Sequence, residues 1–520
     1  MAQSHTSYST TREEAAPIWS DVIKNSKQIA TEPKQTYLLN TVKIDLNEAE
    51  TFRRYTFGRK DPKKRNRTIL LVGETGSGKS ALINMMVNYM LGVEWEDNIM
   101  FKIISDEGTR RQTQSQTIAI TAYEIYGLEE LSVPFSLTVI DTPGFGDTEG
   151  LENDQRVSQY FYKLLTSTRG IQQIDAACLV VKATENRLSL SQKYIFDAIL
   201  SLFGKNMEKN ILTLITFSDW MPPSEALEAV AESGVPFPKD ENDEPLHFLF
   251  NNLSLKNYKK KSENAYKSHW DNGKESMREF FQTLDRMETQ SMRMTENVLE
   301  ERRRLEACIQ SVESQIKVVE MKLKALGEVK KTLKEHKEDM RKNTNFQFKY
   351  KTVVMKKVPA AEAALLCPKC EVTCHTPCTW APDLWLCHVM DWNWNCTACP
   401  GKCSYKVHEK GHTAYKPEYE EKTGTYEDQK KTSEGTTAAQ EKVIRESICE
   451  QELRNAEAEK TSLIERCFQC ILQLRELALK FESDSTRQSI LRLIEVLKRD
   501  NEAEKAETLQ DILENTVQRD

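Results

Sequence analysis

The chain has 520 residues, of which 29% are charged and 39% hydrophobic, and its formal net charge is −7. This length exceeds what one hydrophobic core serves, so we expect several domains. The acidic balance argues against a general nucleic-acid binder, and no stretch approaches the roughly 18 to 20 apolar residues of a membrane-spanning helix. Because the N-terminus lacks the apolar core of a signal peptide, we expect a cytoplasmic protein whose 13 cysteines are thiols or metal ligands.

Residues 1–58 are predicted to be a polar leader, with a short helical patch over residues 18–29 and a candidate strand over residues 37–44. A basic run over residues 63–67 follows the leader. We expect this run to be a solvated linker, with contact to acidic lipid as the alternative.

Residues 59–285 alternate apolar runs with amphipathic segments, which is the pattern of a parallel sheet covered by helices. The clearest predicted strands are 68–72, 135–140, 176–182 and 210–216. The first of them leads directly into Gly73-Glu74-Thr75-Gly76-Ser77-Gly78-Lys79-Ser80, and Ala81 then opens a helix-like segment. The order of strand, glycine loop and helix predicts an α/β P-loop NTPase with three α/β/α layers.

In such a loop the backbone amides and the helix dipole bind the phosphates. Lys79 would bridge the outer phosphates, and the Ser80 hydroxyl would hold Mg²⁺. A second box, Asp141-Thr142-Pro143-Gly144, ends another predicted strand. Asp141 would hold Mg²⁺ through water, and the Gly144 N–H would approach the γ-phosphate. Between the boxes we expect Thr117 to donate its hydroxyl to Mg²⁺, with Thr113 and Thr121 as competing candidates.

The base should be read after the strand over residues 210–216, where Thr216-Phe217-Ser218-Asp219 occupies the place of a guanine-reading [NT]-K-x-D box. Asp219 can accept two hydrogen bonds from guanine, and adenine offers no matching pair. Phe217 replaces the usual lysine. Asn252 of Phe250-Asn251-Asn252 would close the base site; the alternatives are a capping role for Asp219 and a simple turn at the asparagines.

The motifs GETGSGKS, DTPGFGD, TFSD and FNN, together with residues 187–204, resemble the GIMAP-type (immune-associated nucleotide-binding) GTPases, relatives of the septins. The resemblance covers residues 66–285. It implies a GTP/GDP switch that self-associates across the nucleotide face and assembles on membranes or with partners. Phe145 follows Gly144 where Ras-like proteins carry a water-orienting glutamine, so we expect slow GTP hydrolysis unless a second subunit supplies a group.

A seven-residue apolar repeat begins after the G domain and predicts a coiled coil over residues 286–350. The repeat consists of Val298, Leu305, Val312, Val319, Leu326, Leu333 and Met340, with Ile309, Ile316 and Leu323 between them. Lys330 and Lys337 occupy the seam further on, so we expect pairing to loosen there. Three arrangements stay open: a buried amphipathic helix, a helical hairpin with residues 441–520, and a parallel dimer.

A Cys/His-rich module is predicted over residues 360–413, followed by a linker over 414–440. Two C-x₂-C pairs and nearby cysteines and histidines match tetrahedral Zn²⁺ ligation. The expected ligands, for one or two structural zinc ions of undetermined partition, are Cys367, Cys370, Cys374, Cys378, Cys387, Cys396, Cys399 and Cys403. In a hairpin, this module would lie at the tip.

These features favour an intracellular GTP-binding protein that acts as a nucleotide-dependent assembly switch. One alternative is a scaffold with permanently bound nucleotide, whose zinc module recognises a partner. The other is an ATP-dependent P-loop ATPase, because the base box lacks its lysine.

Overall fold

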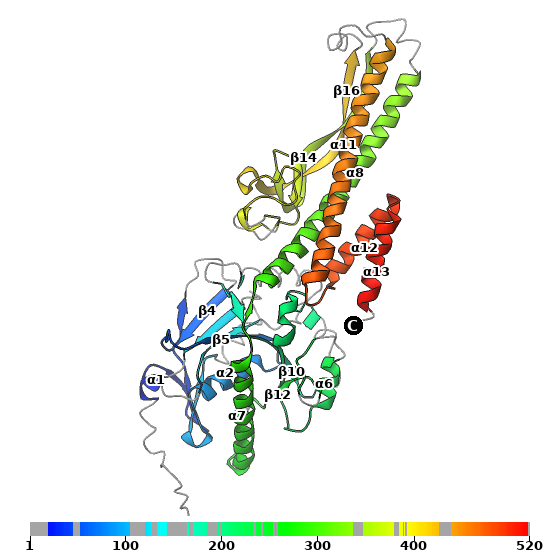
Figure 1. Cartoon of the computed structure of the whole chain (residues 1–520). Coiled ribbons are helices and arrows are strands. Elements are labelled where there is room, and N and C mark those ends of the chain that lie inside the picture. The colour runs from blue at the N-terminus through cyan, green and yellow to red at the C-terminus, as the bar shows by residue number, and fades with distance from the viewer. Residues whose placement is uncertain are drawn as a thin grey trace, which may run out of the picture. The chain divides into compact units, whose positions relative to one another are not determined.

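The computed structural model describes residues 19–44, 52–104, 120–126, 133–142, 164–165, 170–184, 196–197, 200–231, 236–240, 243–252, 255, 258–335, 347–378, 384–387, 389–390, 393–425 and 438–517. They form two compact units (Figure 1). The N-terminal unit takes in the described residues up to Asn297 together with Ala478–Phe481. The C-terminal unit takes in those of Val298–Leu477 and Glu482–Val517.

The N-terminal unit is built on an eight-stranded sheet, ordered β12-β11-β10-β5-β8-β7-β4-β3. The strands are β3 Val42–Ile44, β4 Phe52–Phe57, β5 Asn66–Val72, β7 Ile120–Ile125, β8 Ser136–Asp141, β10 Ala176–Lys182, β11 Ile211–Thr216 and β12 His247–Leu249. The five strands from β12 to β8 are parallel, and β7 pairs antiparallel with β8. The four strands expected from the sequence are therefore present within two residues of their predicted bounds.

Helices α2 (Lys79–Met90) and α7 (Glu263–Arg286) pack on one face of this sheet, and α6 spans Ser224–Ala231. Their apolar side chains share a core with inward residues of β5, β8, β10 and β11. Leu70 and Val72 point to the other face and are also completely buried. A strand buried on both faces reads as a continuous apolar run, which is why β5 was evident in the sequence.

The structure differs from the expected polar leader. The described residues between 20 and 57 contribute α1 (Ser20–Lys24), β3 and β4. They also contribute β1 (Lys27–Ala30) and β2 (Gln35–Leu38), which form a small sheet with β6 (Ile99–Lys102). Trp19 anchors the segment, because its ring is buried and its Nε1 donates to the Leu91 carbonyl at 2.8 Å. Helix α1 lies within the predicted helical patch, and the candidate strand over residues 37–44 overlaps β2 and contains β3, whereas β1 and β4 were not predicted.

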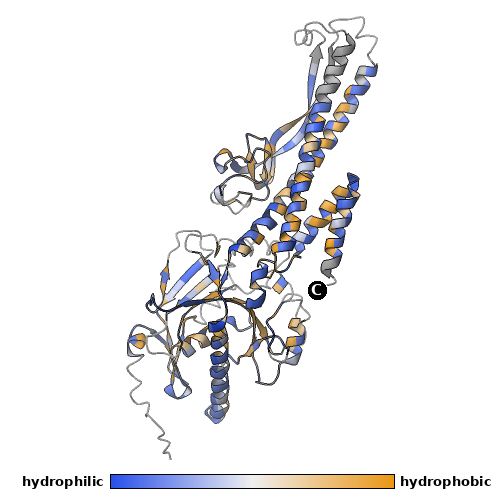
Figure 2. Cartoon of the chain, in the orientation of Figure 1, coloured by the Kyte–Doolittle hydropathy of each residue, from blue (hydrophilic) through white to orange (hydrophobic). Residues whose placement is uncertain are grey.

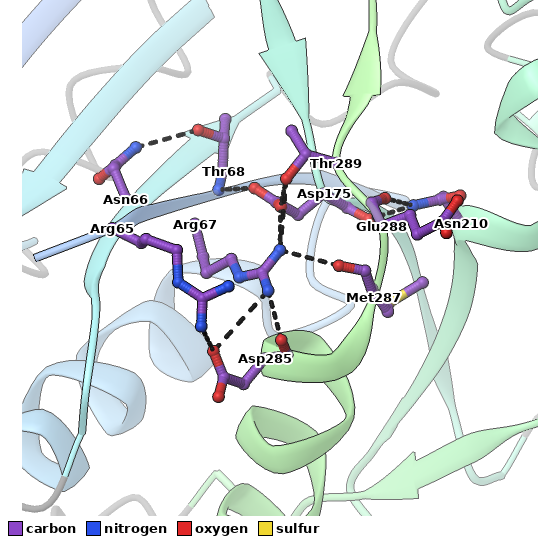
Figure 3. Close-up of polar contacts among 10 residues, drawn as sticks. All are labelled: Arg65, Asn66, Arg67, Thr68, Asp175, Asn210, Asp285, Met287, Glu288 and Thr289. Carbon is purple, nitrogen blue, oxygen red and sulfur yellow. Dashed lines mark hydrogen bonds and ion pairs between the residues drawn. The ribbon is translucent and has the colours of Figure 1, made fainter.

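A buried ion pair joins the amino ends of β5 and β10 to the segment after α7 (Figure 3). Arg67 donates to Asp175 at 2.6 Å and to the Met287 carbonyl at 2.9 Å, and it also bonds the Asp285 carbonyl. The expectation of a solvated basic linker is wrong for Arg67, whose side chain is only 5% exposed. Just beyond, β13 (Gln290–Ser291) pairs with β9 (Gln173–Ile174).

The C-terminal unit is organised by an antiparallel pair of helices, α8 (Arg293–Glu335) and α11 (Ala438–Leu477), followed by α12 (Asp484–Arg499) and α13 (Ala503–Val517). Figure 2 shows hydrophobic and hydrophilic residues mixed along both long helices. Val319 and Leu326 of the heptad row pack with Leu453 and Ala456. The structure thus shows the hairpin arrangement, and the seam residue Lys330 forms an ion pair with Glu450 at 2.9 Å.

A long β-ribbon replaces part of the expected linker. Strand β14 (Gln347–Cys367) pairs antiparallel with β16 (Glu409–Thr425), and the short β15 (Val372–His375) joins it at the end that carries the cysteines. The ribbon packs along α8, since Lys351 lies 3.4 Å from Glu328 and the Tyr419 hydroxyl donates to the Met321 carbonyl.

The ribbon carries the Cys/His module back along α8, away from the hairpin tip. The prediction that the module lies at the tip is therefore wrong. Leu365 and the cysteines share a core with Ala307, and Gln310 donates to the Thr376 carbonyl at 3.1 Å. The described residues also contain short 3₁₀ helices, at Trp95–Asp97, Lys205–Asn210, Lys260–Ser262, Leu384–Leu386 and Tyr405–Val407. Every helix in the described ranges falls short of the apolar length needed to span a membrane.

Candidate functional site

The loop between β5 and α2 lies at the carboxyl edge of the parallel strands. Gly78 precedes α2 with φ +92°, a left-handed conformation that favours glycine. A Cβ at Gly78 would also lie 2.7 Å from Nδ2 of Asn252. The backbone conformation and the approach of Asn252 therefore both disfavour a larger residue at this position.

Lys79 is held inside this loop rather than in solvent. It is 7% exposed, and its Nζ donates to the carbonyls of Gly73 at 2.6 Å and Glu74 at 2.9 Å. Burial lowers the pKa of Lys79, while the nearby Asp141 opposes that shift. The loop thus concentrates positive charge at the point where a polyanion would meet its backbone amides.

Asp141 ends β8 beside β5, in register with Leu71. Its Oδ1 is buried and has no hydrogen-bond partner in the described part of the chain. Burial raises the pKa of Asp141 to about 6, and Lys79 acts in the opposite direction. A buried carboxylate oxygen with unused acceptor capacity beside a phosphate loop fits an oxygen-binding cation such as Mg²⁺, with Ser80 on the first turn of α2 as its predicted companion.

Two further segments tie the predicted base side of the site to the loop. The Thr216 hydroxyl, at the end of β11, donates to the Ser77 carbonyl at 2.6 Å. Asn252 donates from Nδ2 to the Gly78 carbonyl at 3.0 Å, and its Oδ1 is buried without a partner in the described ranges. Asn251 donates to the Ser218 carbonyl at 2.8 Å, which joins the FNN loop to the segment after β11.

Asp219 lies at the exposed rim of the same edge. Its Oδ1 accepts a hydrogen bond from the Met221 N–H at 3.0 Å, which forms a local turn. Phe217, in the position of the usual lysine, has φ +55° and is 49% exposed. An exposed aromatic ring beside an exposed carboxylate is a suitable surface for a planar base.

The structure brings most of the predicted nucleotide residues to one edge of the sheet, and they are Gly73, Glu74, Thr75, Gly76, Ser77, Gly78, Lys79, Ser80, Ala81, Asp141, Asp219 and Asn252. Thr117 and Gly144 lie outside the described residues. Thr216 was not among the predicted ligands, although its place at the end of a buried strand facing the loop could have indicated it.

The Cys/His module brings its predicted ligands into three groups whose ligand atoms lie within 4.8 Å of one another. The groups are Cys367, Cys370, Cys399 and Cys403; Cys374, Cys396, Cys399 and His408; and His375, Cys378 and Cys387. All eight expected cysteines are included. The predicted ligands were cysteines alone and did not include His375 and His408, although both histidines follow cysteines at short spacing in the sequence.

Sulfur spacings in these groups fit zinc. Zn–S bonds of about 2.3 Å at a tetrahedral ion place sulfurs about 3.8 Å apart. The Sγ atoms of Cys370 and Cys403 are 3.7 Å apart, and those of Cys378 and Cys387 are 3.6 Å apart. The contact between the two thiols lowers the pKa of Cys378 and raises that of Cys387, so Cys378 is the member of the pair that favours the thiolate, the metal-binding form.

Comparison with known proteins relates the P-loop segment to the septins. Residues 63–163 match the septin family model. Septin-1 from Bos taurus is 41% identical over 81 residues, and Septin-5 from Homo sapiens is 34% identical over 103 residues. These matches cover 16% and 18% of this chain, and 19% and 25% of the two septins. The chain therefore carries a septin-like P-loop GTPase segment and spans a quarter or less of those relatives' length.

Solved structures align more loosely. Toc33 from Arabidopsis thaliana, crystallised with Mg²⁺ and GMPPNP, is 17% identical, with 41% of this chain and 86% of that chain covered and a TM-score of 0.25. The translation elongation factor SelB from Methanococcus maripaludis is 16% identical, with 43% and 34% covered and a TM-score of 0.22. Overlaps at this level carry no argument about the site.

Proposed function

We propose that this chain binds GTP and GDP and acts as a nucleotide-dependent assembly switch in the cytoplasm. One observation carries the proposal: at the glycine loop of a septin-like segment, a buried lysine lies near a buried carboxylate oxygen that has no hydrogen-bond partner among the described residues. Such groups are costly to bury unless a ligand uses them. We also propose that the chain is a GIMAP-type GTPase, on the basis of its GETGSGKS, DTPGFGD, TFSD and FNN motifs.

The residues have distinct roles toward the nucleotide. Loop amides from Gly73 to Ala81 would hold the phosphates, Lys79 would neutralise the outer ones, and Asp219 would accept two N–H groups of guanine. Ser80, Asp141 and Thr117 would hold Mg²⁺, which supplies charge neutralisation at the phosphates. The Gly144 N–H would sense the terminal phosphate, and Asn252 would close the base side.

Hydrolysis should be slow in a single chain. Phe145 can neither orient nor polarise water, and positioning is most of the catalysis in phosphoryl transfer. Self-association across the nucleotide face would supply the missing group. A hydrolysis rate per molecule that rises with protein concentration would indicate this activation by a second subunit.

The C-terminal unit would convert the nucleotide state into contact with a partner. Structural Zn²⁺ would fold the Cys/His module, and the helical hairpin would support it. The cysteines in the described ranges form no disulfides, and in the cytoplasm we expect them to be thiols or metal ligands. We expect a protein partner or a membrane surface, and no nucleic acid.

The experiment that tests this function compares assembly of the full chain with a GTP analogue and with GDP by analytical ultracentrifugation. We expect larger species with the GTP analogue. Asp219→Asn should lose GTP affinity and gain xanthosine triphosphate affinity, because xanthine has a carbonyl where guanine has an amine. That variant should then assemble with the xanthosine nucleotide alone.

Two outcomes would support the rivals instead. Displacement of bound GTP by equimolar ATP would favour an ATP-dependent P-loop ATPase. Nucleotide that stays bound through every change of state, with assembly unaffected, would favour a scaffold whose zinc module recognises the partner.

A further inference from the structure

The three Cys/His groups cannot be satisfied by one metal ion. Cys374 and His375 are consecutive residues of β15, and consecutive strand residues point to opposite faces. The structure accordingly places Cys374 with Cys396 and His408, and His375 with Cys378 and Cys387. The strand geometry itself separates these ligands into two sites.

Cys399 belongs to both of the four-ligand groups. It lies in the turn that carries Cys396 and Cys403, where the Cys399 N–H donates to Cys396 Sγ at 3.4 Å and the Cys403 N–H donates to Cys399 Sγ at 3.3 Å. Backbone N–H bonds to sulfur stabilise thiolates. A thiolate has further lone pairs, so one sulfur can bridge two cations.

His408 is prepared as a ligand of the second group. The residue is 5% exposed, and its Nδ1 lies 2.9 Å from the Ser404 carbonyl, to which it can donate. That bond fixes the tautomer with a free lone pair on Nε2. Nε2 is buried and has no hydrogen-bond partner in the described ranges. One ring nitrogen of His408 lies within 4.8 Å of the sulfurs of Cys374, Cys396 and Cys399.

In the group formed by Cys367, Cys370, Cys399 and Cys403, the backbone at Gly401 passes close to the ligand sulfurs. A Cβ on Gly401 would lie 3.0 Å from Cys370 Sγ and 3.1 Å from Cys403 Sγ. The third group packs toward α8, because Glu306 is near enough to His375 to interact electrostatically and Gln310 donates to the Thr376 carbonyl. A carboxylate near a ligating histidine is a common outer-shell partner.

We propose that the module holds three zinc ions: a pair that shares the Cys399 thiolate, and a separate ion held by His375, Cys378 and Cys387. The assignment rests on the zinc binding proposed above and is independent of GTP binding. Each ion displaces thiol protons to solvent as it binds, and the six thiolates of the pair leave it with net negative charge. The third site has three protein ligands in the described ranges, which leaves room for one more ligand.

The test is the zinc content of the purified full chain, measured by plasma mass spectrometry. We expect about three ions per chain, about two in Cys370→Ser or Cys378→Ser, and about one in Cys399→Ser. Cys467→Ser is the matched control, since Cys467 is buried on α11 outside all three groups, and it should keep all the zinc.

A second measurement uses the wild-type chain, so its result does not depend on whether the variants fold. Reconstitution of the wild-type chain with ¹¹³Cd²⁺ should give three NMR signals, two of them split by mutual coupling through the shared sulfur. Three uncoupled signals, or a Cys399→Ser loss equal to that of Cys370→Ser in a folded protein, would overturn the sharing. Two signals would overturn the third site, and a zinc-free protein would overturn zinc binding as well, with GTP affinity unaffected in each case.

Discussion

The two ends of the parallel strands in the N-terminal unit bury charge in opposite ways. At the amino ends, both carboxylate oxygens of Asp175 accept hydrogen bonds, from Arg67 and Thr289 on one and from the Thr68 N–H on the other. At the carboxyl ends, Oδ1 of Asp141 accepts none within the described residues. Burial of a carboxylate alone therefore does not indicate a site: both oxygens of Asp175 are used within the protein, whereas Oδ1 of Asp141 keeps acceptor capacity for a ligand.

The largest expected effect is on stability at the amino ends. Asp175→Ala should lower the free energy of unfolding by about 3 to 5 kcal/mol, because Arg67 would remain buried without its carboxylate. Chemical denaturation measures the loss. Asp219→Ala, at the exposed rim of the other end, is the control and should change stability by about 0.5 kcal/mol or less. Equal losses in the two variants would erase the distinction between the ends.

At the carboxyl ends of the strands, removal of a buried charge should lower the affinity for GTP rather than the stability of the fold. Lys79→Met removes the ammonium and keeps an unbranched side chain of similar length. We expect GTP affinity to fall about 100-fold or more, which corresponds to about 2.7 kcal/mol. Stability without nucleotide should hold or rise, since a desolvated cation is removed. Titration with a fluorescent GTP analogue and denaturation of the same samples test both; a destabilised variant with unchanged affinity would make Lys79 structural.

The raised pKa of Asp141 predicts a dependence of Mg²⁺-supported binding on pH. Because the pKa is about 6, the carboxyl is mostly ionised at pH 7 and mostly protonated at pH 5. Lys79 and Tyr123 are the titratable groups that interact with it. The magnesium-dependent part of GTP affinity should therefore fall about tenfold from pH 7 to pH 5. Asp141→Asn should bind weakly at both values, and a pH profile that this variant retains would place the titration elsewhere.

The smallest effect concerns the contact between β11 and the loop. Thr216→Val keeps the shape of the side chain but removes the hydroxyl that donates to the Ser77 carbonyl. We expect a loss of about 1 kcal/mol in stability and a few-fold loss of GTP affinity. Thr213→Val is the matched control, because the Thr213 hydroxyl on the same strand is buried and without a partner in the described ranges. It should not weaken GTP binding.

Features that depend on local pattern could be predicted from the sequence. The apolar run of β5 followed by glycines and Lys79, the heptad row in α8 and the cysteine spacing each reflect chemistry that acts over a few residues. On α11, Cys467 and Ile471 lie four residues apart and are both completely buried, as residues on one apolar helix face are.

Features that depend on contacts between residues far apart in the sequence could not be predicted. Arg67 looks like part of a solvated basic run until Asp175, more than a hundred residues away, is placed beside it. The ribbon strands β14 and β16 carry lysines and glutamates at exposed positions. They therefore lack the apolar alternation that predicts a strand, and from residue 414 onward the sequence of β16 predicts a linker. Their pairing, for example Lys356 with Glu418 at 3.7 Å, appears only when both strands are present.

The central claim is that the carboxyl ends of the parallel strands form a guanine-nucleotide site. Isothermal titration of the purified, nucleotide-stripped full chain with GTP in magnesium buffer tests it most directly. We predict one GTP per chain, displaced by GDP and not by equimolar ATP. Folded protein that takes up no heat on GTP addition and retains no labelled GTP in equilibrium dialysis would contradict the claim.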